Sequence, residues 1–184
     1  MSRLRFTTAL EVFDAFPSAR DDIRAAPTPE APAAFLDALR RSDTPEDAVT
    51  FLAYALGRRE AVWWAAQSVR LLGRIANGGE DAMLLAAESW VRDPEDLRRR
   101  EALRLGMASD RRLATTWVAL AAAWSGGNVA PGQVVVMATP EMTPKAARTG
   151  ILVALATVTA RERASRLQLC VDAGARLMQA GTGT

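Results

Sequence analysis

The chain has 184 residues, of which 49% are hydrophobic, with 23 basic and 21 acidic side chains and a net charge of +2 at pH 7. This length suits one domain whose core needs neither disulfides nor metal ions to fold. The only cysteine, Cys170, excludes an intramolecular disulfide and favours the cytoplasm. We expect neither a secretory signal nor insertion into a membrane, because no apolar run approaches the roughly 20 residues of a spanning helix.

Helix start signals recur along the chain. Thr8 and Glu11 fit a capping box, which predicts a first short helix that ends before Pro17. Acidic residues and a proline directly follow Thr44 and Asp93, as is typical of helix amino termini. Each of these signals precedes a segment with apolar residues at helical spacing.

Two later helices carry more specific expectations. Ser109 or Asp110 is expected to cap a helix with a core stripe at i, i+4, i+7 and i+11, formed by Leu113, Trp117, Leu120 and Trp124. The final helical region keeps one apolar face over a long span, but Thr159 and Glu162 form a possible capping box inside it. We favour two helices there over one.

These patterns, with a composition dominated by alanine and leucine, predict an all-α fold. We expect a single domain over residues 1–184, built as an irregular bundle of about eight helices, with a disordered tail at 181–184. The helix lengths vary and no fixed period recurs, which disfavours a regular solenoid.

Residues 125–142 interrupt the helical pattern with glycines and prolines. A connection of this length without secondary structure is uncommon in a compact domain, so we interpret it as a binding element or a cover. Its centre has strand character at Val134, Val135 and Val136, and no second convincing strand exists to pair with it. One hypothesis is that these valines dock by adding a strand to the sheet edge of a partner.

The segment 58–76 reads as an amphipathic helix with an apolar stripe and a polar face. The residues of the polar face, which is the candidate interaction surface, are Arg59, Trp63, Gln67, Arg70 and Arg74. Trp63 is unusual because it shares this face with arginines. A neighbouring helix or loop that covers the indole is the simpler interpretation, and an interface anchor is the functional one.

The sequence offers no catalytic constellation. It contains no histidine, which removes the commonest general base, Ser-His and Cys-His pairs, and histidine-bearing metal sites. Adjacent carboxylates such as Glu46 and Asp47 point about 100° apart on a helix and suit its positive end better than a shared proton or ion. We therefore expect no catalytic, cofactor-binding or metal-binding residues.

Two alternatives to protein binding remain open. An interhelical pocket with Arg59, Glu60 and Arg70 would suit an anionic ligand or an enzyme's substrate, since arginine binds anions in a bidentate manner. The arginines between Arg98 and Arg112, with a sequence pI of about 9.3, raise the possibility of nucleic-acid binding. The interleaved charges and the absence of an adjacent aromatic platform argue against that second alternative.

Several strings resemble an uncharacterised bacterial family of small helical proteins. The resemblance rests on the segments 58–65 (RREAVWWA), 123–127 (AWSGG) and 143–146 (TPKA), and on 6–17 and 44–49. It would cover nearly the whole chain. Members of that family appear near type VI secretion genes, and the resemblance implies an accessory role without assigning any catalytic residue.

The leading hypothesis is a non-enzymatic, cytoplasmic protein-interaction or adaptor module. Its expected partner is another protein, conceivably a secretion component, and the contact would use the Trp63 face and the valines of the long loop. The sequence does not indicate an oligomeric state.

Overall fold

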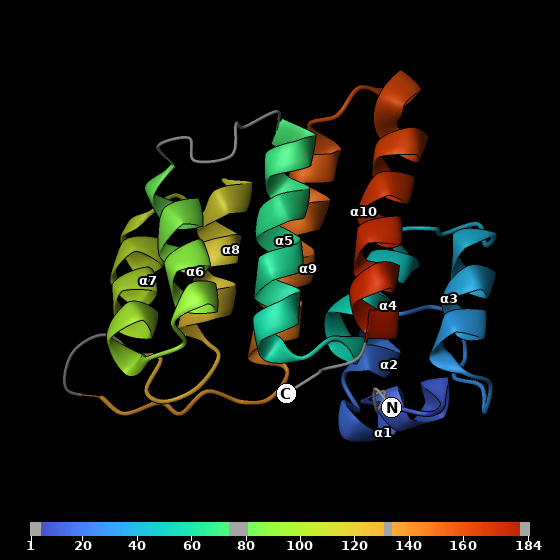
Figure 1. Ribbon diagram of the computed structural model, residues 1–184, viewed down its shortest axis with the longest axis horizontal. Coiled ribbons are helices and arrows are strands. Elements are labelled where there is room, and N and C mark those ends of the chain that lie inside the picture. Colours follow the sequence, from blue (N-terminus) through green and yellow to red (C-terminus); the bar gives the residue numbers. More distant parts are fainter. Residues whose placement is uncertain (1–4, 74–80, 131–133, 181–184) are drawn as a thin grey trace.

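The computed structural model describes residues 5–73, 81–130 and 134–180. Within them the chain forms ten α-helices and no β-strand (Figure 1). In chain order these are α1 (Ala9–Ala15), α2 (Ala19–Asp22), α3 (Pro32–Arg40), α4 (Asp47–Ala55), α5 (Arg58–Gly73), α6 (Ala82–Arg92), α7 (Asp96–Ala108), α8 (Ala114–Ala123), α9 (Met142–Ala156) and α10 (Ala160–Ala180). The all-α prediction is confirmed, and the described residues form ten helices where about eight were expected, counting the four-residue α2.

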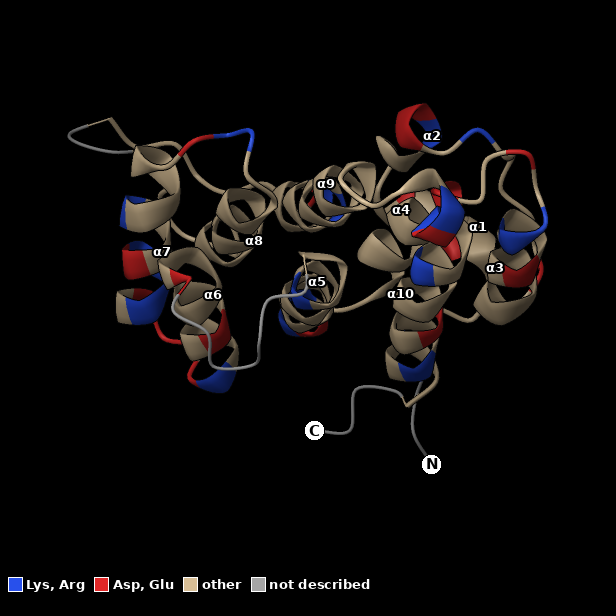
Figure 2. Cartoon of the chain, turned by 90° about the horizontal axis from the view of Figure 1, so that it is seen from above, with Lys and Arg blue, Asp and Glu red and all other residues tan. Residues whose placement is uncertain are grey.

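The chain crosses the molecule and then returns. Helices α5 to α8 follow one another side by side, and α9 comes back to lie against α8, α5 and α4 (Figures 1 and 2). Helix α10 then packs on α4 and α5. Because α9 contacts helices from both ends of the chain, it joins the two halves of the bundle into one body.

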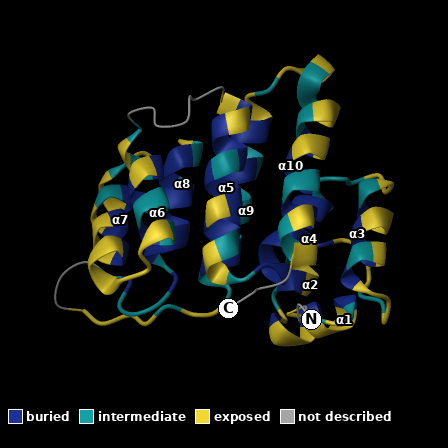
Figure 3. Cartoon of the chain, in the orientation of Figure 1, coloured by how far each residue is buried: buried dark blue, intermediate teal, exposed yellow. Residues whose placement is uncertain are grey.

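Helix α8 lies in the interior of one half (Figure 3). It carries no charged residue, and Val118 and Leu120 are fully buried. A helix that is apolar on all sides is stable only when other elements cover it. Two glycines permit this close packing: a Cβ at Gly106 of α7 would lie 2.9 Å from Leu120 Cδ2, and one at Gly150 of α9 would lie 3.2 Å from Val118 Cγ2.

Two predicted helix starts are confirmed. The Thr8 side chain accepts a hydrogen bond from the Glu11 backbone, and Glu11 reaches back to the Thr8 backbone, as a capping box requires. The final helical region is divided into α9 and α10, and Thr159 contacts Glu162 where α10 begins. The predicted stop of α5 near residue 78 and the predicted disordered tail at 181–184 lie outside the described residues.

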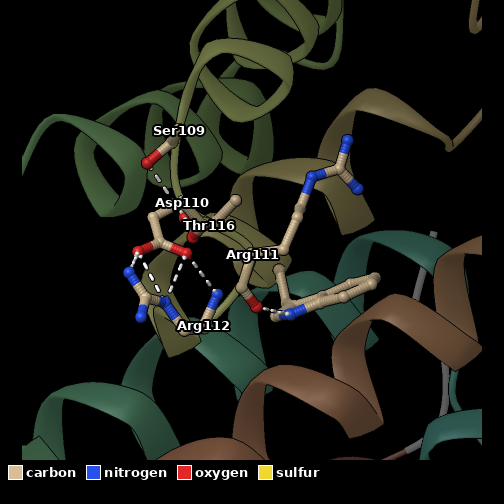
Figure 4. A network of polar contacts seen from close by, with 6 residues as sticks. Ser109, Asp110, Arg111, Arg112 and Thr116 are labelled. Atoms are coloured by element: carbon tan, nitrogen blue, oxygen red, sulfur yellow. Dashed lines mark hydrogen bonds and ion pairs between the residues drawn. The ribbon is translucent and has the colours of Figure 1, made fainter.

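The prediction that Ser109 or Asp110 caps α8 was wrong, since α8 begins at Ala114. Figure 4 shows why. The Asp110 carboxylate accepts hydrogen bonds from the backbone and the guanidinium of Arg112, so it is occupied within the turn. The Asp110 carbonyl accepts from the Thr116 hydroxyl at 2.7 Å, which fixes the turn against α8.

This turn also removes one residue from the expected core stripe. Leu113 is 51% exposed, whereas Leu120 is fully buried. Trp117 and Trp124 are partly buried and pack edge to face with their ring centroids 6.3 Å apart. The Trp117 indole donates to the carbonyl of Arg111, so its polar end is satisfied at the rim of the core.

Within residues 5–73, 81–130 and 134–180, no helix combines the length and the apolar character that crossing a membrane requires.

Candidate functional site

Helix α5 places two neighbouring tryptophans in opposite environments. Trp64 is 1% exposed, and its indole donates to the carbonyl of Cys170 in α10 at 2.8 Å. Trp63 is 41% exposed and lies on the side of α5 that faces α6. Successive residues on a helix point about 100° apart, so one faces the core while the next faces solvent. The Trp63 indole is thus only partly covered, whereas an indole covered by a neighbouring helix or loop was the simpler expectation.

Trp63 lines an open groove of ≈ 670 Å³ between α5 and α6, which we call the α5–α6 groove. Its lining residues are Arg59, Trp63, Gln67 and Arg70 of α5 and Glu88, Val91 and Arg92 of α6. The structure thus brings four of the predicted surface residues together. The fifth, Arg74, lies outside the described residues.

Arg70 is the exception to the predicted polar face, because its side chain is only 2% exposed. Its guanidinium donates to both carboxylate oxygens of Glu88 in α6, at 2.6 Å and 2.9 Å. The hydrogen bond to Glu88 raises the pKa of Arg70, outweighing the burial that lowers it. The sequence could not show this pairing, since Glu88 lies eighteen residues away on another helix.

The remaining polar residues of the groove also have defined partners. Gln67 Nε2 donates to Glu88 at 3.4 Å. Arg59 Nε donates to the Val91 carbonyl at 2.6 Å, and its Nη2 lies 3.5 Å from the Arg92 carbonyl. These carbonyls end α6, where a cation complements the partial negative charge of the helix terminus. The first turn of α5 is thereby held against the last turn of α6.

The chemistry of the α5–α6 groove favours binding over catalysis. Arginine stays protonated at any physiological pH, so it does not serve as a general acid or base. The one carboxylate that lines the groove, Glu88, is occupied by Arg70. Among the described residues, no three carboxylate, thiol or imidazole groups lie close enough together to hold a metal ion.

The long loop forms a short hairpin that the sequence did not predict. The Val129 backbone donates to the Val136 carbonyl at 2.8 Å, and Ala138 donates to Gly127 at 2.9 Å, on either side of an antiparallel bridge between Asn128 and Met137. As expected, no second β-strand pairs with the valine segment among the described residues, but one isolated bridge joins it to Asn128. The partner is a single bridge beside two glycines, which is too short to register as a strand pattern.

The valine segment, residues 134–137, lies along the lower edge of the molecule and is exposed (Figure 3). Val134, Val135 and Val136 are all exposed, Val135 the most at 70%, and Met137 follows them at 61%. Val136 faces the other strand, and its N–H donates to the Asn128 side chain. The backbone groups of Val135 and Met137 make no hydrogen bond to a described residue and point along the outer edge.

A buried arginine anchors this hairpin. Arg99 of α7 donates to the Ala123 carbonyl at 3.0 Å and to the Asn128 carbonyl at 3.1 Å, while Asp96 neutralises its charge. Gly127 has a φ of +64°, and a Cβ there would lie 2.9 Å from Arg99 Nη2. In the sequence, Arg99 cannot be distinguished from the other arginines of the Arg98 to Arg112 cluster. Only the fold reveals its burial.

Most of the other arginines in that cluster are paired with nearby carboxylates. The pairs are Arg100 with Asp96, Arg104 with Glu101 and Arg112 with Asp110. Hydrogen bonds from Arg99 and then Arg100 lower the pKa of Asp96, and those from Arg104 and Arg112 lower the pKa of Glu101 and Asp110. The charge available to a phosphate backbone is correspondingly reduced.

The residues of the anionic-ligand alternative are not gathered. Arg59 and Arg70 line the α5–α6 groove, but Glu60 lines a different pocket, with Arg5 and the carboxyl-terminal end of α10. The Arg5 guanidinium in that pocket donates to the carbonyl of Leu56. Burial lowers the pKa of Arg5.

One comparison with known proteins identifies the family of the chain. Residues 35–178 match the model of the family of unknown function DUF6931, so the chain belongs to that family. The match spans the groove and the hairpin. No curated protein and no solved structure matches the chain.

Proposed function

We propose that this DUF6931 member is a non-enzymatic protein-interaction or adaptor module that binds its partner in the α5–α6 groove. The observation that carries the proposal is Trp63, a large aromatic side chain left 41% exposed in a groove between two helices. Tryptophan and arginine are the residues that most often dominate binding energy at protein interfaces.

The groove is also preorganised. Arg70 and Gln67 are held by Glu88, and Arg59 is held by the end of α6. A partner therefore does not have to order these side chains when it binds, which lowers the entropic cost of association.

The partner is expected to be another protein in the cytoplasm. The resemblance of the 58–65 segment to proteins that appear near type VI secretion genes makes a secretion component the first candidate. This assignment is part of the proposal and rests on that resemblance alone.

The outer edge of the hairpin supplies a second contact surface in this proposal. Val135 and Met137 present backbone donors and acceptors beside exposed apolar side chains, which is the arrangement that strand addition uses. If hydrogen exchange finds the amides of residues 134–137 equally protected in the isolated protein and in cell extract, this second contact is removed.

The two alternatives have weaker support. An anionic ligand held between Arg59 and Arg70 meets an Arg70 guanidinium that Glu88 already neutralises, and Glu60 is turned to another pocket. Nucleic-acid binding through the Arg98 to Arg112 region meets arginines that are largely ion-paired. A filter-binding titration at two salt concentrations tests the latter, since such binding falls steeply with salt.

Affinity capture from the native cytoplasm tests the proposal directly. Wild type is compared with Trp63→Ala and with Leu169→Ala, a control that removes an exposed apolar side chain from α10. The expected result is a set of proteins that Trp63→Ala loses and Leu169→Ala keeps. Recovery of the same proteins by all three chains contradicts the proposal.

A further inference from the structure

The charges around Trp63 specify the partner more closely than the presence of a groove does. Three arginines and one glutamate line the α5–α6 groove. Taking the proposed interaction function as its premise, we infer that the groove binds an acidic segment of a partner protein, in which a carboxylate lies next to an apolar side chain.

Some charges of the groove are neutralised within the fold and others are available to a ligand. Arg70 and Glu88 form a buried pair and cancel one another. Arg59 uses Nε and Nη2 on the carbonyls that end α6, and its Nη1 makes no hydrogen bond to a described residue. Arg92 is exposed, and its side chain makes no ion pair with a described residue. Two guanidinium groups thus remain to face a ligand.

The nearby carboxylates do not cancel these two cations. Asp93 follows Arg92 in the chain, but its carboxylate lies 3.9 Å from Arg98 on α7. Glu60 follows Arg59, but it lines the pocket beside Arg5. The end of α6 contributes only a fraction of a negative charge, roughly half a unit. The mouth of the groove is therefore positive.

The apolar and the charged parts of the groove lie about one helical turn apart. Trp63 follows Arg59 by one turn of α5, a rise of about 6 Å along the helix axis. Val91, on α6, lines the groove beside them. An apolar side chain packed on Trp63 and Val91 would place a carboxylate one turn away within reach of Arg59 and Arg92. Arginine binds carboxylates through paired hydrogen bonds, so this contact is specific as well as attractive.

A single-stranded nucleic acid also combines negative charge with surfaces that stack on indole rings. It normally requires a cationic track with several aromatic platforms along the strand. The groove offers one exposed indole and two available guanidinium groups. A short peptide matches this footprint better, and the nucleic acid becomes an outcome of the test.

Peptide selection on the full chain tests the inference. A library of random 16-residue peptides on phage is selected on wild type, and the same library is selected on Trp63→Ala and on Leu169→Ala. The expected peptides depend on Trp63, survive on Leu169→Ala, and are enriched in Asp or Glu beside an apolar residue. Neutral or basic Trp63-dependent peptides would overturn the inference, and so would the absence of any Trp63-dependent peptide.

A charge exchange then tests the contact itself. The most enriched peptide is labelled, and its dissociation constant is measured by fluorescence anisotropy with wild type, Arg92→Glu and Arg161→Glu. Arg161→Glu changes the net charge equally on the exposed surface of α10. Arg92→Glu is expected to weaken binding at least tenfold and Arg161→Glu less than twofold, with binding to Arg92→Glu restored when the peptide's acidic residue becomes lysine. Equal weakening by both variants, or tight Trp63-dependent binding of single-stranded DNA in place of the peptide, would overturn the inference.

The inference and the proposed function fail in different ways. One outcome is that affinity capture recovers Trp63-dependent partners while the selected peptides are not acidic. In that case the proposed interaction function stands, and the inference of an acidic partner segment fails. If capture shows no Trp63-dependent partner, the interaction function itself falls. Melting curves for every variant confirm that each compared chain is folded.

Discussion

The two sides of α5 are built in different ways. Towards α10, Trp64 is covered almost completely, and Gly174 lets the helices approach so closely that a Cβ there would lie 2.9 Å from the Trp64 ring. Towards α6, the helices are joined by the Arg70–Glu88 pair and by Arg59, and an open groove remains.

This difference shows how one helix can serve both stability and recognition. Small residues and an apolar ring exclude water, and their contacts give stability in proportion to the area they bury. Long polar side chains fix the distance between α5 and α6 without filling the space between them. The α10 side is therefore expected to respond to substitution through stability, and the α6 side through binding.

The largest expected effect is a difference in stability between variants of the two adjacent tryptophans. Trp64→Ala removes a buried ring and its hydrogen bond to Cys170, and is expected to lower the free energy of unfolding by about 4 kcal/mol. Trp63→Ala removes a ring that is 41% exposed and is expected to cost about half as much, roughly 2 kcal/mol. Urea denaturation followed by circular dichroism measures both. Equal losses would show that Trp63 is covered in solution.

The next effect concerns the pair that holds α5 to α6. Glu88→Ala removes the carboxylate that neutralises the buried Arg70, and is expected to cost about 3 kcal/mol. Replacing both residues, as Arg70→Met with Glu88→Leu, should restore most of that loss because neither charge remains buried. Denaturation of the single and double variants measures this. A single variant as stable as wild type would mean that the pair is open to solvent.

A smaller effect is expected at the closest approach of α10 to α5. Gly174→Ala places a Cβ 2.8 Å from Leu52 Cδ1 and 2.9 Å from the Trp64 ring, so the helices must separate, at a cost of about 2 kcal/mol. The alanine itself favours the helix by up to about 1 kcal/mol, which makes any net loss a packing effect. The thermal midpoint measures the change, and an increase would contradict the close contact.

The smallest expected effect on stability concerns Cys170, which lies in α10 on the covered side of α5. Burial raises the pKa of this thiol, so it stays protonated in the native state when an unfolded thiol would ionise. Native protein at pH 8 should react with iodoacetamide far more slowly than protein in urea. The unfolded chain loses the proton first as pH rises above the ordinary thiol pKa, so stability should fall there, and less in Cys170→Ala. Rapid labelling of the native protein would contradict the burial of the Cys170 thiol.

Sequence reasoning predicted the features that depend on local spacing. The helices, the Thr8 capping box, the division at Thr159 and the opposite directions of Trp63 and Trp64 all follow from residues within a few positions of one another. Helical periodicity places a side chain on a face, and capping chemistry places a boundary.

Sequence reasoning failed for side chains whose hydrogen-bond or ion-pair partner lies far away in the sequence. Arg70 was assigned to a polar surface because Glu88 could not be located from the sequence. Arg99 resembles its exposed neighbours in the sequence, yet it reaches the carbonyls of Ala123 and Asn128. Long polar side chains occur both in water and across buried seams, so their burial becomes visible only with the tertiary fold.

Solvent exchange of the indole N–H protons tests the contrast between the two sides of α5 most directly. Nuclear magnetic resonance spectra of the isolated protein, with Trp63→Phe and Trp64→Phe to identify the signals, compare both tryptophans in one sample. The Trp63 proton should exchange rapidly in the isolated protein and slow when the captured partner is bound, while the Trp64 proton stays protected throughout. A Trp63 proton as protected as that of Trp64 in the isolated protein would contradict the existence of an open binding surface.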